Sequence, residues 1–226
     1  GHERTYRSHT MTKTIRVGCA SGFWGDSYIA APQLIERGNI DYLVFDYLSE
    51  ITMSIMARAM AKDPNAGYAI DFVSVTMASI ARDVAAKKIK VIANAGGVNP
   101  RACAAALEAL LAKLGVDLKV AWIEGDDLMP GLDRWRAAGL TEMFTGMALP
   151  EKLVSMNAYL GGFPVAAALA AGADIVVTGR CVDSAVTLGA CIHEFGWTPS
   201  DYDRLAGASL AGHIVECGAQ ACGGIF

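Results

Sequence analysis

The chain has 226 residues, of which 53% are hydrophobic, so it is long enough to bury one sizeable core. A formal net charge of −4 and a pI near 5.6 leave no broad basic surface for a nucleic-acid backbone. The apolar runs fall far short of the roughly 20 residues that a membrane-spanning helix needs. The composition therefore argues against nucleic-acid and membrane partners.

The two ends of the sequence and its cysteines add further limits. Residues 1–10 are polar and rich in Arg and His, so we interpret them as a tag remnant or disordered tail before Met11. The chain stops in apolar residues at 222–226, which indicates a single domain over residues 11–226 that is the N-terminal part of a longer protein. The six cysteines lack CxxC spacing and follow no apolar leader, which favours reduced thiols and a cytoplasmic location.

Five short runs of β-branched and apolar residues predict buried parallel strands, because none has the alternation of a half-exposed strand. The runs are residues 15–20, 42–46, 90–94, 119–124 and 174–178. Apolar residues at helical spacing lie between them, at residues 27–37, 51–62, 71–87, 100–114 and 163–171. The alternation predicts an α/β fold with a mostly parallel sheet flanked by helices. An open, Rossmann-like sheet is favoured over a partial barrel, because two helices separate the second and third strands.

The region from residue 126 to residue 157 interrupts this alternation. Proline and glycine break any regular pattern there, at Pro130, Gly131, Gly139, Gly146 and Pro150. We therefore expect a loop-rich insertion, and a flap over a site is one use for such a segment.

Polar residues follow each predicted strand at its carboxyl end. Because these ends line the ligand crevice of parallel sheets, we expect the clusters to converge on one site for a polar small molecule. The candidates for catalysis are Asp46, Asn94, Asp126 and Asp183. The alternative is that each acid only caps the next helix, which Asp and Ser commonly do. Capping explains one acid at each strand end, but it does not explain the accompanying second polar residue.

A glycine-rich turn, GFWGDS, follows the first predicted strand at residues 22–27. Its spacing is not GxGxxG and it lacks the Lys of a phosphate loop, so it does not predict a nucleotide site. Gly25, Asp26 and Ser27 can still point backbone N–H groups and a hydroxyl at an anion, and we assign them to substrate binding.

A second glycine turn, NAGGVNP, follows the third predicted strand at residues 94–100. Gly96 and Gly97 allow close approach of a ligand to the backbone, and Asn99 offers amide donors together with Asn94. We assign Gly96, Gly97 and Asn99 to substrate binding. A loop held by its own backbone hydrogen bonds is the alternative.

Arg180, after the last predicted strand, is the best single candidate for binding an anionic substrate. A guanidinium group forms paired hydrogen bonds with a carboxylate or phosphate, although an ion pair with Asp183 is the rival interpretation. The acids grouped after the second and fourth strands could bind Mg²⁺ or Ca²⁺: Asp46, Glu50, Glu124, Asp126 and Asp127. No His joins them, so we assign no metal ligand and leave the cofactor unknown.

Two histidines follow Met11. His193 ends a helical stretch and is interpreted as a surface residue. His213 precedes Glu216 by one helical turn and Cys217 by four residues, so an acid–base pair or a thiol nucleophile is conceivable there. A structural role for His213 is the alternative.

Five motifs, in this order along the chain, resemble the acyclic terpene utilisation family, AtuA. They are residues 22–27 (GFWGDS), 94–100 (NAGGVNP), 157–161 (NAYLG), 172–185 (GADIVVTGRCVDSA) and 216–220 (ECGAQ). The resemblance covers residues 15–226. It implies a bacterial cytoplasmic protein encoded with enzymes that degrade citronellol, geraniol or related branched acids as CoA esters. Family members are usually longer, and the resemblance implies no settled reaction, so the site residues above come from strand-end placement.

Two classes of function fit these observations. The first is a catabolic enzyme, a lyase, hydratase or hydrolase that acts on a carboxylate or CoA ester of acyclic terpene degradation. The second is a non-catalytic subunit that binds an acyl ligand or a partner enzyme. A purely structural domain is a third alternative, and a homo-oligomer is expected in either of the first two cases.

Overall fold

The computed structural model describes residues 13–224, so the predicted tail and Met11 lie outside the described residues. Five strands form one sheet: β1 (Val17–Ser21), β2 (Tyr42–Phe45), β3 (Lys90–Ala93), β4 (Val120–Ile123) and β5 (Ile175–Thr178). Their order is β1-β2-β3-β5-β4, and every neighbouring pair is parallel. β1 and β4 are the two edges, so the sheet is open. The predicted α/β class and the preference for an open sheet are confirmed.

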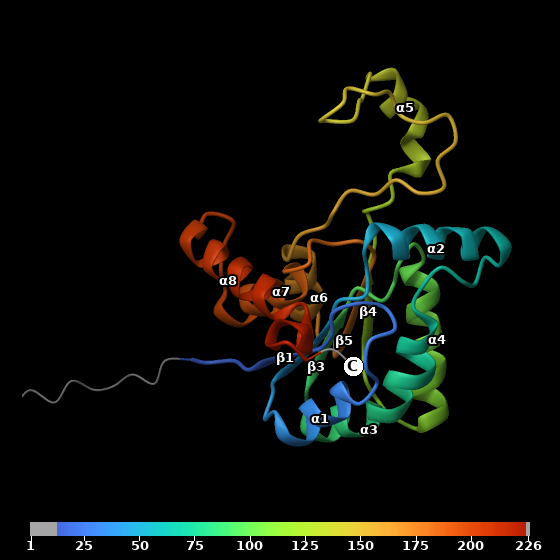
Figure 1. Ribbon diagram of the computed structural model, residues 1–226. Coiled ribbons are helices and arrows are strands. Elements are labelled where there is room, and N and C mark those ends of the chain that lie inside the picture. Colours follow the sequence, from blue (N-terminus) through green and yellow to red (C-terminus); the bar gives the residue numbers. More distant parts are fainter. Residues whose placement is uncertain (1–12, 225–226) are drawn as a thin grey trace, which may run out of the picture.

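Helices cover both faces of the sheet (Figure 1). α1 (Ala30–Arg37), α3 (Ala78–Lys87) and α4 (Pro100–Leu114) lie on one face, and α6 (Phe163–Ala170) and α7 (Ala185–Phe195) lie on the other. Right-handed crossovers explain the division, because β1 to β4 advance across the sheet in one direction and the step from β4 back to β5 reverses it.

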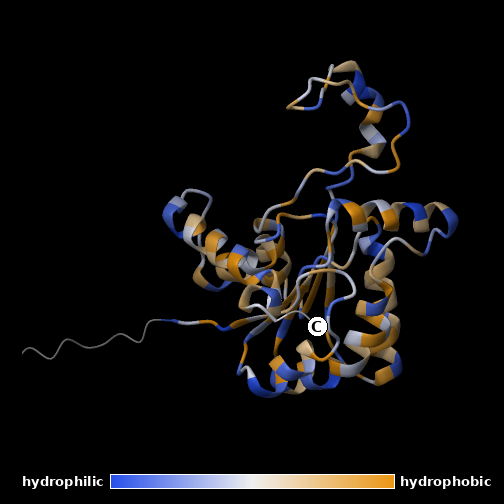
Figure 2. Ribbon diagram, in the orientation of Figure 1, coloured by the Kyte–Doolittle hydropathy of each residue, from blue (hydrophilic) through white to orange (hydrophobic). Residues whose placement is uncertain are grey.

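Each strand contributes alternate residues to two apolar cores, one on each face of the sheet. In β2, Leu43 and Phe45 face the core under α1, α3 and α4, while Tyr42 and Val44 face the core under α6 and α7. Figure 2 shows the resulting apolar strands at the centre of the molecule. Burial on both faces explains why the strand sequences are continuous apolar runs.

The helix predicted at residues 71–87 is two segments in the structure. A π-helix (Phe72–Met77) precedes α3 and buries Phe72, Val73, Thr76 and Met77. The Phe72 ring packs edge-on against Phe45, with ring centres 5.3 Å apart. A π-helix widens each turn by one residue, and such segments occur frequently near functional sites.

α2 (Glu50–Lys62) begins with a capping box, in which the Ser49 and Thr52 side chains bond each other's backbone N–H groups. Met53 and Met56 are its buried residues, so much of the helix surface is exposed to solvent. The C-terminal region adds α8 (Tyr202–Val215) and a 3-10 turn (Gly218–Cys222) that packs against β1. α8 was not among the predicted helices, whereas α7 accounts for the helical stretch that ends near His193.

Residues 126–157 form an arm that projects away from the sheet (Figure 1). The arm contains a 3-10 turn (Met129–Gly131) and the short helix α5 (Leu132–Ala137), followed by irregular chain with a bridge between Thr141 and Ala148. Asp126 is its only buried residue. The predicted loop-rich insertion is confirmed, although the arm extends outward and only its base approaches the polar edge of the sheet.

Asp174 connects three strands at the amino end of the sheet. Its carboxylate accepts hydrogen bonds from Lys90 Nζ at 2.6 Å and from the Lys119 backbone N–H at 2.9 Å. Burial raises the pKa of Asp174, but these two hydrogen bonds outweigh it and hold the pKa below its ordinary value.

We expect Asp174→Asn to lower the free energy of unfolding by about 1 kcal/mol at neutral pH. Because a depressed native pKa stabilises only the ionised form, this difference is present above the pKa of the unfolded chain and disappears as the pH falls through the native pKa. Urea unfolding at neutral and acidic pH measures it, with Asp117→Asn, an exposed carboxylate, as the control. A difference that is independent of pH would contradict the explanation.

Candidate functional site

The carboxyl ends of the five strands place the predicted polar clusters along one edge of the sheet. After β3 the chain enters α4 on one face, whereas after β5 it enters α7 on the other face. Such a reversal opens a crevice between neighbouring strands, where ligands of open parallel sheets bind. The residues that follow β3 and β5 therefore lie at the position where a ligand site is expected.

Asp46 and Asn94 meet beneath this edge. Asp46 is 4% exposed, and its Oδ1 accepts a hydrogen bond of 2.5 Å from Asn94 Nδ2. Asn94 Oδ1 in turn accepts from the Tyr47 backbone N–H at 2.6 Å, which fixes the orientation of the amide. The Glu216 carboxyl also lies beside Asp46. Burial, followed by this contact with Glu216, raises the pKa of Asp46 to about 8.

Arg180 is 5% exposed and reaches the same edge from the end of β5. Its Nη1 donates to Asp183 Oδ1 at 3.2 Å and to the Cys181 carbonyl at 3.1 Å. The guanidinium carbon lies 4.1 Å from the centre of the Tyr159 ring, close enough for a cation–π contact. Nη2 is 3.7 Å from Glu50 Oε1, and Nε has no hydrogen-bond partner among the described residues. The guanidinium is thus held by Asp183, the Cys181 carbonyl and the Tyr159 ring, and its contact with Glu50 is longer than a hydrogen bond.

A cavity of about 290 Å³ lies against Arg180. It is lined by Glu50, Met53, Ser155, Met156, Asn157, Tyr159 and Arg180. The Tyr159 hydroxyl donates to the Glu50 carboxylate, and this hydrogen bond lowers the pKa of Glu50. The cavity therefore combines one buried cation, an aromatic face and an exposed carboxylate at its entrance.

Asp126 positions the Arg180 segment rather than facing the cavity. Its Oδ2 accepts from the Arg180 backbone N–H at 2.8 Å and from Asn157 Nδ2 at 2.9 Å. A Cβ at Gly179 would overlap the Asp126 carboxylate, so glycine is needed for this approach. Burial raises the pKa of Asp126, and the hydrogen bonds oppose that rise. Asp126, which was predicted to be catalytic, thus lies close to the cavity, and its hydrogen bonds support the segment that carries Arg180.

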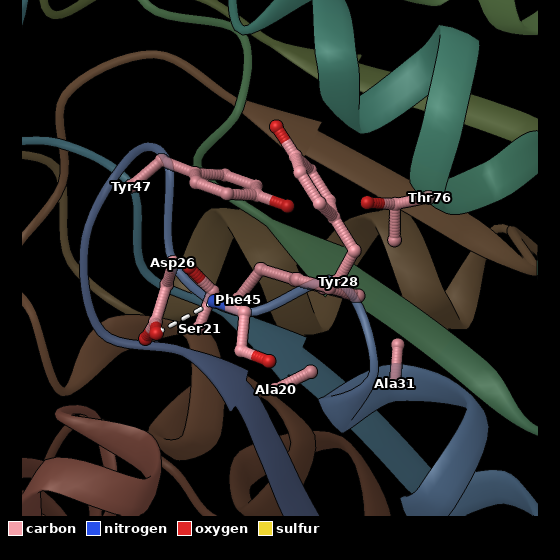
Figure 3. Close-up of a pocket in the computed structure, with 9 residues that line it drawn as sticks. Ala20, Ser21, Asp26, Tyr28, Ala31, Phe45, Tyr47 and Thr76 are labelled. Carbon is pink, nitrogen blue, oxygen red and sulfur yellow. Dashed lines mark hydrogen bonds between the residues drawn. The ribbon is translucent and has the colours of Figure 1, made fainter. Parts of the chain in front are cut away.

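The turn after β1 is held by its own side chain. Asp26 accepts from the Gly22 backbone N–H at 2.9 Å and from the Ser27 N–H at 2.7 Å, while Gly25 has a φ of +96°. Asp26 and Ser27 line a cavity of about 10 Å³ beside Tyr47 and Thr76 (Figure 3). This volume suits about one water molecule. The assignment of Gly25, Asp26 and Ser27 to substrate binding stays a prediction, and the cavity at Arg180 does not include them.

The glycines after β3 bring backbone segments together. The Gly96 N–H donates to the Thr178 carbonyl at 3.0 Å, and a Cβ on Gly96 would lie 2.5 Å from that oxygen. Gly97 has a φ of +56°, and a Cβ there would overlap the Met56 sulfur. These contacts pack the segment after β3 against β5 and α2. The groups that lie close to the two glycines are therefore parts of this chain.

Asn99 caps α4, where its Oδ1 accepts from the Ala102 N–H at 3.3 Å. Its Nδ2 donates to the Pro64 carbonyl at 2.9 Å and to the Ala66 carbonyl at 2.8 Å. The amide is therefore occupied by backbone groups on both sides. Its contact with substrate stays a prediction. The contacts that Asn99 makes in the structure are those of the alternative, a loop held by its own hydrogen bonds.

The acids suggested for Mg²⁺ or Ca²⁺ have separate partners. Glu124 pairs with Arg101 at 3.1 Å, and Asp127 accepts from the Met129 N–H at 2.9 Å. A different group, His213, Glu216 and Asp183, comes together, and its two acids lie near Asp46, which was one of the suggested acids. Sequence reasoning noted His213 and Glu216 as a local pair, and it missed Tyr159 and Glu50 as neighbours of Arg180. The NAYLG motif, which contains Tyr159, was the available signal.

The fold and its polar strand ends define an α/β protein of the open parallel-sheet class. The chain belongs to the acyclic terpene utilisation family, because the model for acyclic terpene utilisation family protein AtuA matches residues 15–226. Membership implies a role in acyclic terpene utilisation, and the match confirms the resemblance to the family inferred from the sequence. No curated protein and no solved structure matches the chain. None of the helices in residues 13–224 is long and apolar enough to cross a bilayer.

Proposed function

We propose that this protein is a catabolic enzyme that acts on a branched acyl carboxylate or its CoA ester and binds the acyl head at Arg180. The observation that carries the proposal is the buried guanidinium, which lies against a cavity of about 290 Å³ and whose Nη2 is 3.7 Å from Glu50, beyond hydrogen-bond distance. A buried cation with free donors is suited to a carboxylate or a thioester carbonyl. A cytoplasmic location and a homo-oligomeric state, both expected from the sequence, are part of the proposal.

Apolar hollows along α2 support a hydrocarbon chain attached to that head. One of about 360 Å³ shares Ser155 and Asn157 with the cavity at Arg180, and a further one of about 540 Å³ shares Ala57 and Ala61 with the first. Apolar side chains contribute much of their lining, including Met60, Val98, Met129, Leu153 and Val154. We call this series of hollows the α2 trough. A polar end at Arg180 and an apolar trough beside it suit an amphipathic ligand.

Carboxyl groups beside Arg180 favour an enzyme over a binding subunit. Asp183 contacts the guanidinium at 3.2 Å and lies near the pair formed by Asp46 and Glu216. Groups that can accept or donate a proton thus lie next to the proposed position of the acyl head, as a lyase, hydratase or hydrolase requires. A non-catalytic acyl-binding subunit would need Arg180 and the trough but not these carboxyl groups.

The comparison of Asp46→Asn with the wild-type protein tests this distinction. We expect the variant to bind a branched ten-carbon acyl-CoA with unchanged affinity and to lose at least tenfold in turnover, measured by mass spectrometry of the products. No product from either protein would favour the binding subunit, and equal, measurable turnover by both would contradict a catalytic role for Asp46. Lost binding in a correctly folded variant would contradict the assignment of the head to Arg180.

Filling the α2 trough should change the preference for chain length. Ala57 lines both of its hollows, so Ala57→Trp should weaken binding of a branched ten-carbon carboxylate about tenfold or more, because each methylene kept out of the trough costs about 0.8 kcal/mol. Binding of a two-carbon carboxylate should be unchanged. Calorimetric titration measures both, with Ile55→Trp, on an exposed part of the same helix, as the control. Equal losses for both ligands would contradict a trough for the chain.

A further inference from the structure

Asp183, His213 and Glu216 form a mixed cluster of metal-ligating side chains. One ligand atom from each lies within 4.8 Å of the others, and His213 Nδ1 is 3.8 Å from Glu216 Oε1. His213 and Glu216 lie one helical turn apart at the end of α8, and Asp183 lies in the turn before α7. The fold therefore brings Asp183 to a pair that the sequence already places together.

Backbone contacts fix the segments that carry these side chains. A Cβ on Gly212 would lie 2.9 Å from the Ser184 carbonyl oxygen, so the end of α8 is pressed against the turn that contains Asp183. A Cβ on Gly22 would lie 2.6 Å from the Cys217 carbonyl oxygen, so the residue after Glu216 is pressed against the turn after β1. Such close contacts fix the backbone that carries the donors before any ion arrives, which favours a specific metal site.

The charges around the cluster leave a negative excess. Glu216 is 7% exposed and lies beside Asp46, which is 4% exposed, and Asp183 lies near them. Arg180 supplies one positive charge to Asp183, and it also lies 3.7 Å from Glu50. Two buried carboxylates in contact repel each other, and bulk water does not solvate them. A cation or a shared proton is therefore needed to neutralise their charge. The imidazole of His213 adds a nitrogen donor, which favours first-row metals over Mg²⁺ or Ca²⁺.

We propose that Asp183, His213 and Glu216 bind a first-row divalent cation of the Zn²⁺ or Mn²⁺ type, with Asp46 directly behind Glu216. Three protein ligands of this kind leave positions for water or substrate, as in catalytic metal sites. Asp46 orients the Glu216 carboxylate from the second layer, as partners of metal ligands commonly do. Cation binding does not depend on acyl binding, so the two proposals are tested separately.

The test is metal binding by the full chain after removal of bound metal with a chelator. We expect equilibrium dialysis against Zn²⁺ or Mn²⁺, followed by elemental analysis, to give about one ion per chain. His213→Ala should weaken binding at least tenfold, and it should fold normally because the imidazole is exposed. His193→Ala, which changes a histidine outside the cluster, should bind as the wild type does. The metal should also raise the melting temperature of the wild type and not that of His213→Ala.

Two results would overturn the proposal. One is a wild-type protein that retains almost no Zn²⁺ or Mn²⁺ after dialysis, which would leave a shared proton as the partner of the buried carboxylates. The other is equal binding by His213→Ala and His193→Ala, which would place the ion elsewhere. Glu216→Gln provides a second variant, and its circular dichroism separates loss of the metal from loss of the fold.

Discussion

Replacing Arg180 with methionine is expected to lower the affinity for a branched ten-carbon carboxylate about a hundredfold. Two charge-assisted hydrogen bonds to a carboxylate together contribute about 3 kcal/mol, which corresponds to roughly that factor. Methionine retains much of the side-chain volume against Tyr159 but offers no donor. Arg180→Lys should lose less, because it retains the charge but not the paired geometry.

Calorimetric titration with the carboxylate measures this effect, and Arg37→Met serves as the control because Arg37 is exposed on α1. Unfolding curves of the two variants separate loss of the site from loss of the fold, since the substitution also removes a partner from Asp183. Unchanged affinity in a folded Arg180→Met protein would contradict the proposed position of the acyl head.

Asp126→Ala is expected to lower the free energy of unfolding by about 3 kcal/mol. The substitution leaves the buried Arg180 N–H and the half-buried Asn157 amide without their acceptor, and an unpaired buried donor alone costs about 1–3 kcal/mol. Binding at Arg180 should weaken as well, because the segment after β5 loses its support. Asp126→Asn retains an acceptor oxygen and should lose less.

Urea unfolding measures this prediction, and the neighbouring Asp127→Ala provides a matched control. Asp127 is exposed and its carboxylate accepts a local hydrogen bond from the Met129 N–H, so its loss should cost less than about 1 kcal/mol. Similar stabilities for the two alanine variants would show that Asp126 does not support the Arg180 segment.

The sheet could be predicted from sequence because its strands are buried on both faces. A run such as IVVT in β5 contains only β-branched residues, and its boundary lies one residue from the prediction. The π-helix could not be predicted, since burial of Phe72, Val73, Thr76 and Met77 also fits an α-helix. α8 has no apolar face, because Leu210 and Ile214 are exposed while Ala208 and Gly212 are buried. Periodicity therefore gave no signal there.

The part of the candidate site that could be predicted is formed by residues that directly follow the strands. Asp46, Asn94, Arg180 and Asp183 follow parallel strands, and the structure brings them to one edge of the sheet. Glu216 could not be placed, because it follows a helix and reaches Asp46 only through packing of the C-terminal segment on β1.

The glycine turns show a different limit of the sequence. A glycine signals that something approaches its backbone closely, but it does not say what approaches. At Gly96 the approaching group is the Thr178 carbonyl of the neighbouring strand. At Gly22 it is the Cys217 backbone, so this glycine contributes to the carboxyl cluster indirectly.

A crystal structure of the protein with a branched ten-carbon carboxylate tests the central claim most directly. We expect the carboxylate within about 3 Å of the Arg180 guanidinium and the hydrocarbon chain in the α2 trough beside Ala57. The Glu50 carboxylate should move away from the guanidinium when the ligand is present. A ligand bound elsewhere, with Arg180 still paired only to Asp183 and Glu50, would contradict the account.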